Sequence, residues 1–428
     1  MSKSIIILFF GMLLSVLIRI FFIANGLDVA DISNLHLSAE AMLKGSNPYL
    51  LFNFAIYPPI SYYIVASILF LSNFLEIPFH ILIKILPNLA DILITLVLYK
   101  FLIKLNVVPI RASLWSLIYF LNPISIIISA AHGQLDSITS LLVLLSIYIL
   151  SVKSKSNQKL LAPLLIGLAI AIKPNPAMLL PFFLVYKKGE VKQGIIFLLI
   201  SATPAIITLA PYIWQSPQAI ITNVFNYSGV YDFSFAAVLR GLWYQQNAHI
   251  WLPIAEKMLG ASKLVFVLGI SLLLFVSAGS RNLSKTCLTV YLLFLGIYFG
   301  ISAQYLIWIL PFAVLTREKM IIPFSVFGTV ALFGFYSFFG PEILYGRFWH
   351  GAAFQSKYML IYFIGNLLLW ITIMWWLIKI IKEYLHSSFQ TFSSLHKKLV
   401  ILTLSIFIFS MIPVLQLVFN LFSQMTNP

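Results

Sequence analysis

Long apolar runs separated by short polar loops constrain this chain more than any other feature. Of its 428 residues, 61% are hydrophobic and only 9% are charged, whereas an average soluble protein carries about 25% charged residues. The mean hydropathy of +1.00 agrees with this bias. A chain of this kind can bury its apolar side chains in a lipid bilayer, where each helix pairs its backbone N–H and C=O groups within itself. We therefore predict an all-α polytopic membrane protein that forms one domain over residues 1–428.

The basic residues predict topology. The net charge of +15 comes largely from lysines and arginines in short loops between the apolar runs. Such residues mark the cytoplasmic side of a membrane protein, so nucleic-acid binding is not expected. Lys3 precedes the first run, which places the N-terminus in the cytoplasm and the polar loop 25–59 on the external side. The single cysteine, Cys287, excludes a disulfide framework and a thiol metal site.

One apolar run does not fit a simple count of crossings. Run 60–75 is short and is followed by no basic residue, whereas run 81–105 ends in Lys100 and Lys104. If both runs crossed the membrane, every later basic loop would be external. We therefore predict that 60–75 lies along or half within the interface, and that about 13 other runs cross. The predicted spans are 4–24, 81–105, 112–131, 137–152, 160–172, 175–186, 195–214, 264–278, 287–300, 305–315, 321–339, 358–379 and 399–422.

Two pairs of predicted spans are too short for a bilayer. Run 160–172 has 13 residues, which is roughly 20 Å of helix against a hydrocarbon core of about 30 Å. Its partner, 175–186, and the pair of runs that meets at 302–304 are similar. Because irregular backbone at membrane depth must line water or protein, we expect a cavity that enters from the external side and hydrates these breaks.

Carboxylates in the first external loop are the strongest catalytic candidates. Asp28 and Asp31 follow the first span directly. A carboxylate held at the membrane surface can act as a general base toward a hydroxyl. Helix capping is the alternative, because 33–45 is typical of an amphipathic helix that Asp31 or Ser33 would cap. Spacing alone does not rank the two aspartates. Asp91, inside a predicted span, is expected to pair with a neighbouring helix.

Lys173 is the cation that the topology does not explain, because it falls between two short spans. An ionisable residue at this depth indicates a functional site, and a lysine suits a phosphate. Snorkelling to the outer interface is the alternative. Motifs for nucleotide hydrolysis and zinc chemistry are absent from the sequence. Further candidates for contacts with a phosphate or a sugar are Tyr57, His132, Gln134, Asp136, Arg240, Gln304 and Tyr305. The alternative for His132–Asp136 is a solvated turn, and the alternative for Gln304-Tyr305 is an interfacial aromatic belt.

Four motifs follow one another along the chain. They are Asp31, Ala39-Glu40, Asn47-Pro48 and Tyr57-Pro58-Pro59 in the first loop; His132-Gly133-Gln134-Leu135-Asp136; Gly167-Leu168-Ala169 before Lys173 and Pro176; and Gln304-Tyr305 with Trp308 and Pro311. In this order, over residues 1–340, they resemble GT-C membrane glycosyltransferases. The layout is most similar to the catalytic subunit of GPI mannosyltransferase I and to bacterial polyprenyl-phosphate-mannose mannosyltransferases. The GPI-type enzymes carry a DxD pair where this chain has Val29-Ala30-Asp31, so the match falls on Asp31 and Asp28 is out of register.

The resemblance implies inverting transfer of a hexose, with mannose the first expectation, from a polyprenyl-phosphate donor to a lipid or glycan acceptor. The reaction would take place at the external face of a bacterial or archaeal cell membrane. Asp31 would be the base, with Asp28 in support. The resemblance assigns Lys173, His132, Gln304 and Tyr305 to the donor phosphate and Tyr57, Gln134, Asp136 and Arg240 to the substrate. Because the lipid-phosphate leaving group implied by the resemblance does not require a divalent metal, we expect no metal or other cofactor. A transporter or flippase for lipid-linked saccharides, or a ligase that joins them, is the alternative. The sequence does not decide whether a partner subunit is needed.

Overall fold

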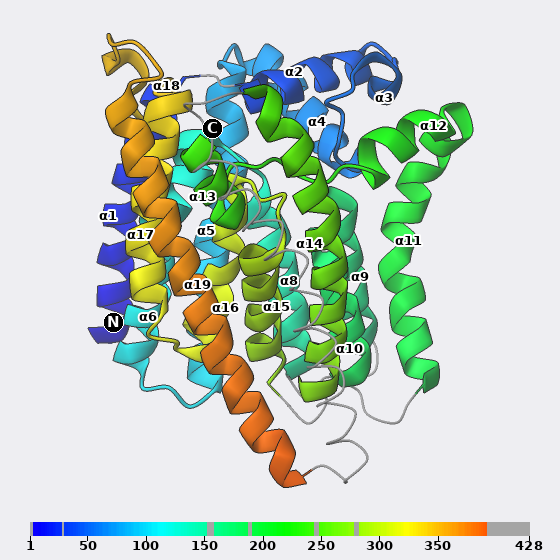
Figure 1. Ribbon diagram of the computed structural model, residues 1–428, viewed down its shortest axis with the longest axis vertical. Coiled ribbons are helices and arrows are strands. Elements are labelled where there is room, and N and C mark those ends of the chain that lie inside the picture. The colour runs from blue at the N-terminus through cyan, green and yellow to red at the C-terminus, as the bar shows by residue number, and fades with distance from the viewer. Residues whose placement is uncertain are drawn as a thin grey trace.

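The computed structural model describes residues 3–27, 30–151, 158–186, 191–243, 248–277 and 282–391. Across these ranges the chain forms helices and loops and no strand, as the all-α prediction requires. The long helices run side by side as one bundle (Figure 1). The Asp28 prediction and the predicted span 399–422 lie outside the described residues.

Six helices in the described ranges are long and apolar enough to cross a membrane. A seventh span is counted if α6 (Pro109–Phe120) continues through a bend of 46° into residues Pro123–His132, which comprise α7 and η1. The prediction of about 13 spans is therefore not confirmed. The six are α1 (Lys3–Asn25), α5 (Phe79–Lys104), α11 (Val191–Gln215), α14 (Ala248–Ser277), α17 (Ile321–Phe339) and α19 (Ser356–Thr391).

Most of the other predicted spans are short helices that end in breaks. Their length is the physical reason for the lower count, since each is shorter than the helix of about 20 residues that crosses a bilayer. These breaks, at 173–174 and 298–302, hold or adjoin the residues described below. The short elements are α8 (Asp136–Ser151), α9 (Gln158–Ile172), η2 (Asn175–Leu179), α10 (Leu180–Tyr186), α15 (Leu283–Ile297), η4 (Ala303–Ile309) and α16 (Leu310–Thr316).

Proline sets where several helices begin. Pro48, Pro59, Pro109 and Pro123 each stand at the start of a helix, where the missing N–H group costs nothing and the fixed φ angle suits a helix. Asn47 also caps α3 (Pro48–Leu51), because its side-chain oxygen accepts from the Tyr49 N–H at 3.0 Å. Helix starts are thus well encoded in this chain.

Three helices form a layer at one end of the bundle. Figure 1 shows α2 (Ala30–Leu43), α3 and α4 (Pro59–Leu75) together there, with the C-terminal end of α19 at the opposite end. The buried side chains of α2 and α4 belong to one apolar cluster that also includes Leu209 and Tyr212 of α11. This placement fits the prediction that 60–75 does not cross. The helix α2 already includes Asp31 and Ser33, so neither caps it from outside.

A buried polar cluster ties α1 to α5. Arg19 of α1 lies 2.7 Å from the Asp91 carboxylate of α5, and both side chains are buried. Asn88 accepts a second hydrogen bond from Arg19, and Ser125 and Tyr119 donate to Asp91. A buried ion pair is tolerated when further hydrogen bonds satisfy both partners. The prediction that Asp91 pairs with a neighbouring helix is confirmed.

Candidate active site

A cavity of 390 Å³ lies at the α2 end of the bundle. Its volume falls in the range of about 300–1,000 Å³ that is usual for small-molecule sites. Segments far apart in the sequence enclose it: α2, the turn before α4, the end of η1, the loop before α13 (Ser234–Trp243), the start of η4, and α17. Its lining residues are Ala30, Asp31, Ile56, Tyr57, His132, Tyr227, Val230, Asp232, Ser302, Ala303, Gln304, Phe335, Tyr336, Phe339, Gly340, Glu342 and Ile343.

Asp31 presents a carboxylate to this cavity from the first turn of α2. Its side chain is 48% exposed. Oδ2 accepts a hydrogen bond from Gln134 Nε2 at 2.9 Å and lies 3.3 Å from His132 Nε2. Oδ1 has no hydrogen-bond partner among the described residues. One oxygen is therefore held in place while the other remains open to the cavity.

Opposing effects set the pKa of Asp31. The largest is desolvation by the cavity walls, which raises it. The hydrogen bond and charge of His132, the charge of Lys173 and the hydrogen bond from Gln134 together outweigh desolvation, so the pKa lies below the ordinary value of 3.8. The carboxylate is consequently ionised across neutral pH and can accept a proton.

Lys173 lies behind the cavity wall rather than in it. Its side chain is buried, and Nζ lies 2.5 Å from Asp136 Oδ2. Nζ also donates to Gln134 Oε1 at 3.3 Å. Because this bond occupies the carbonyl oxygen of Gln134, the amide nitrogen faces Asp31. Lys173 therefore does not snorkel, and its contacts orient the residue that holds the carboxylate.

The Tyr57 side chain lies between Lys173 and the cavity. The Lys173 ammonium lies 4.8 Å from the centre of the Tyr57 ring, a cation–π distance, and Tyr57 itself lines the cavity. The Tyr57 backbone is fixed from both sides, because its carbonyl accepts from Tyr49 Oη and its N–H donates to Tyr62 Oη. The Lys173 ammonium is thus separated from the cavity by the Tyr57 ring.

The turn that carries His132 and Gln134 depends on a glycine. Gly133 adopts a φ of +85°, and a Cβ atom there would lie 2.8 Å from Cγ of Lys84. Glycine adopts this left-handed conformation without steric cost. The turn places the side chains of His132 and Gln134 beside the Asp31 carboxylate. On its other side, Nδ1 of His132 lies 2.7 Å from Tyr336 Oη.

Asp136 and the η4 residues complete the predicted set. Asp136 Oδ1 accepts from Trp308 Nε1 at 2.8 Å, which joins α8 to η4. Tyr305 stacks on Trp308 with ring centres 4.2 Å apart and does not line the cavity. Gln304 does line it. Of the predicted residues in the described ranges, those that line the cavity are Asp31, Tyr57, His132 and Gln304, and those that support it from behind are Gln134, Asp136, Lys173, Arg240 and Tyr305.

Asp232 is the main cavity residue that the sequence reasoning did not select. Its Oδ1 accepts from Arg240 at 2.6 Å, so Arg240 reaches the site through Asp232. Burial raises the pKa of Asp232, while Arg240 opposes that shift and the charge of Asp31 adds to it. The chain has only 12 acidic residues, and the predicted topology places Asp232 on the external side with Asp31, which is the signal that could have identified it. Within the described ranges, no three His, Cys, Asp or Glu side chains come together as a metal site would require.

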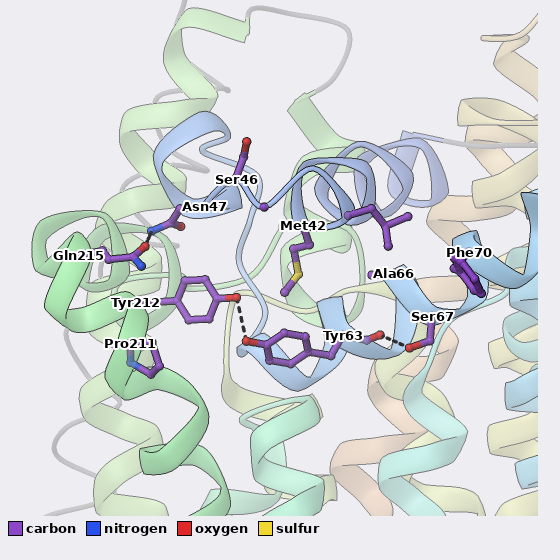
Figure 2. Close-up of a pocket in the computed structure, with 12 residues that line it drawn as sticks. Met42, Ser46, Asn47, Tyr63, Ala66, Ser67, Phe70, Pro211, Tyr212 and Gln215 are labelled. Atoms are coloured by element: carbon purple, nitrogen blue, oxygen red, sulfur yellow. Dashed lines mark hydrogen bonds between the residues drawn. The ribbon is translucent and has the colours of Figure 1, made fainter.

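A larger hollow of 590 Å³ lies between α4 and α11, beside the C-terminal end of α2. Figure 2 shows Tyr63 and Tyr212 joined across it, with Asn47 and Gln215 meeting at one side. Its lining residues include no carboxylate, histidine, lysine or arginine. The hollow therefore offers tyrosine hydroxyls but no carboxylate that could act as a base near neutral pH. The smaller cavity, which does contain carboxylates, is the candidate active site.

The comparison with known families decides the class of protein. The model of glycosyltransferase family 87 matches residues 54–297, which is more than half of the chain. The chain belongs to glycosyltransferase family 87. Among curated proteins, none matches it. Together with the apolar helices, membership makes this family 87 protein a multi-pass membrane glycosyltransferase that acts on a sugar donor and an acceptor.

Proposed function

We propose that this family 87 enzyme transfers a hexose, with mannose the first candidate, from a polyprenyl-phosphate donor to an acceptor hydroxyl with inversion. We place the reaction at the external face of a bacterial or archaeal membrane. One observation carries the proposal: an ionised carboxylate, Asp31, faces a cavity with one oxygen held and the other free. That arrangement suits a base that must keep its geometry while it takes a proton.

The transfer is a single displacement in this scheme. The acceptor hydroxyl donates its hydrogen bond to Oδ1 of Asp31 and its oxygen attacks the anomeric carbon. As the new C–O bond forms, the bond from the anomeric carbon to the phosphate oxygen breaks, and the polyprenyl phosphate leaves with the electron pair. The proton remains on Asp31. Attack from the face opposite the leaving group inverts the anomeric configuration.

A positively charged side chain beside the leaving phosphate supports the proposed displacement. Among the described residues that line the cavity, His132 is the side chain able to carry positive charge. We assign His132 and Gln304 to the phosphate, with Lys173 adding its charge from behind Tyr57. Groups aimed at charge that develops in the transition state contribute a few kcal/mol each. Tyr305 and Asp136 act in this scheme by holding Gln304 and Lys173 in place.

A donor panel tests the proposal. Purified full-length protein in lipid nanodiscs is incubated with polyprenyl-phosphate hexoses, or with the matching nucleotide sugars, and membrane-lipid acceptors. We expect hexose transfer from a polyprenyl-phosphate donor, with the opposite anomeric configuration in the product, and none from a nucleotide sugar. Transfer from nucleotide sugars, or retention of configuration, contradicts the proposal.

A further inference from the structure

Asp232 is a second carboxylate in the cavity wall and differs from Asp31 in its surroundings. Its side chain is 23% exposed. Oδ1 is taken by Arg240 at 2.6 Å, and the Arg240 guanidinium lies 4.8 Å from the centre of the Phe339 ring, which also lines the cavity. Oδ2 has no hydrogen-bond partner in the described part of the chain. An acceptor with strong hydrogen-bonding capacity is therefore left for a ligand.

The backbone holds Asp232 firmly in this position. The N–H groups of Asp232 and Phe233 both donate to the carbonyl of Ile301, at 3.1 and 3.0 Å, and Tyr362 Oη donates to the Asp232 carbonyl. Beside this contact, the loop containing Gly229 packs directly on Gly300, where a Cβ atom would overlap the Ser228 carbonyl oxygen. The loop that contains Gly229 and Asp232 is thus packed against the loop that contains Gly300 and Ile301, and the latter leads directly to Gln304. Such positioning is what a selective contact needs.

The remaining wall has the chemistry of a sugar site. Five aromatic side chains line the cavity with Asp232. Aromatic rings pack against the C–H faces of a pyranose, while a carboxylate accepts from its hydroxyls. Hydrogen bonds to a charged group are stronger than neutral ones. The five are Tyr57, Tyr227, Phe335, Tyr336 and Phe339.

We infer that Asp232 accepts a hydrogen bond from a hydroxyl of the transferred hexose through Oδ2 and thereby selects the sugar. The inference rests on the proposed function and adds a residue that determines specificity. A half-buried carboxylate positioned for one hydroxyl discriminates against an epimer that points that hydroxyl elsewhere, because the free carboxylate oxygen is then left unpaired. Arg240 positions the carboxylate and does not contact the sugar in this arrangement.

Two measurements on the full-length protein test the inference. The first is calorimetric binding of methyl α-hexopyranosides that differ at one carbon. We expect the wild type to prefer one epimer and D232N to bind that epimer about ten-fold more weakly, with the preference lost. The second is transfer kinetics, in which D232N raises the KM for the hexose donor about ten-fold and leaves the acceptor KM unchanged.

Controls separate selection from a structural role. Arg240→Gln removes the same ion pair but leaves the Asp232 carboxylate, and Glu40→Gln removes a surface carboxylate that pairs with Lys44. Equal losses of melting temperature in D232N and R240Q, with wild-type affinity and epimer preference, overturn the inference. A raised acceptor KM with an unchanged donor KM overturns it as well. If no polyprenyl-phosphate donor is used but D232N still loses epimer-selective binding, the proposed donor is wrong and the sugar contact stands.

Discussion

At the scale of single residues, two carboxylates share one cavity with different surroundings. Asp31 is surrounded by His132, Gln134 and, behind them, Lys173, all of which favour its ionised form. Asp232 is more enclosed, and burial raises its pKa despite Arg240. Pairs of titratable groups whose environments push their pKa values apart commonly divide catalytic roles. We assign proton transfer to Asp31 and sugar recognition to Asp232.

His132→Gln should change the pH dependence of the reaction. A base works when deprotonated, and the Asp31 pKa lies below 3.8 in the wild type, so kcat/KM should not fall as pH drops from neutral to mildly acidic. Loss of the His132 hydrogen bond and charge leaves desolvation less opposed, which raises the Asp31 pKa. The acid limb should therefore move toward neutral pH. Glu40→Gln, on the same helix, should keep the wild-type profile, and an unchanged profile in H132Q would argue against this electrostatic coupling.

The sequence identified most of the acid–base residues but not their arrangement. Asp31 follows the first span, His132 lies at a span end and Gln304 lies at the break between two short runs, so the sequence predicts all three, and all three line the cavity. Lys173 was also selected, but its burial against Asp136 follows from how α8 and α9 pack, which no local pattern shows. Asp232 is not predictable in this way, because its place in the cavity wall depends on a loop contact with Ile301.

At the scale of elements, breaks between short helices build the site. The breaks at Lys173 and before Gln304, and the turn at Gly133, bring their residues to one end of the bundle from three separate segments. Irregular backbone at membrane depth must line protein or water, and here it lines the cavity and the wall behind it. The short lengths of these helices were predictable from the apolar runs. The number of complete crossings was not, since a short run and a full span have the same composition.

Gly133→Ala should destabilise the protein and weaken transfer together. A non-glycine residue at φ +85° costs about 1–2 kcal/mol, and the new Cβ would also lie 2.8 Å from Lys84 Cγ. The turn must shift, which moves His132 and Gln134 relative to Asp31. Gly45→Ala is the matched control, because Gly45 has a φ of +73° but a Cβ atom there would meet nothing within 4 Å. We expect both variants to have a lower melting temperature than the wild type, and only G133A to lose glycosyl-transfer activity. Equal activity in the two would show that the turn geometry is unimportant.

At the scale of the whole molecule, the candidate active site and a group of ion pairs lie at opposite ends of the bundle. The layer of α2, α3 and α4 covers the first, and at the other end Lys285 and Lys379 pair with Glu318 and Glu383. The buried Arg19–Asp91 pair fixes α1 against α5. The distribution of basic residues among the loops predicts that these two ends face opposite sides of the membrane.

Cysteine labelling tests whether α4 crosses the membrane. The native Cys287 is buried, which lowers the labelling background. In intact cells, Asn73→Cys and Ser46→Cys should react with an impermeant maleimide from the same, external side, because α4 lies in the layer with α2. Lys382→Cys, near the end of α19, should react only after the membrane is permeabilised. Reaction of N73C only after permeabilisation would show that α4 is a span and would invert the predicted topology of every later loop.

The central claim is that the Asp31 carboxylate is the base of a glycosyl transfer, and the most direct test is single-turnover transfer by Asp31→Asn. The asparagine keeps the size of the side chain and a hydrogen bond to Gln134 but cannot take the proton. General base catalysis contributes about 10²–10⁴-fold, so we expect the rate from a labelled polyprenyl-phosphate hexose to fall by at least about 100-fold. Donor affinity and melting temperature should stay near those of the wild type. Transfer at the wild-type rate by D31N would contradict the account.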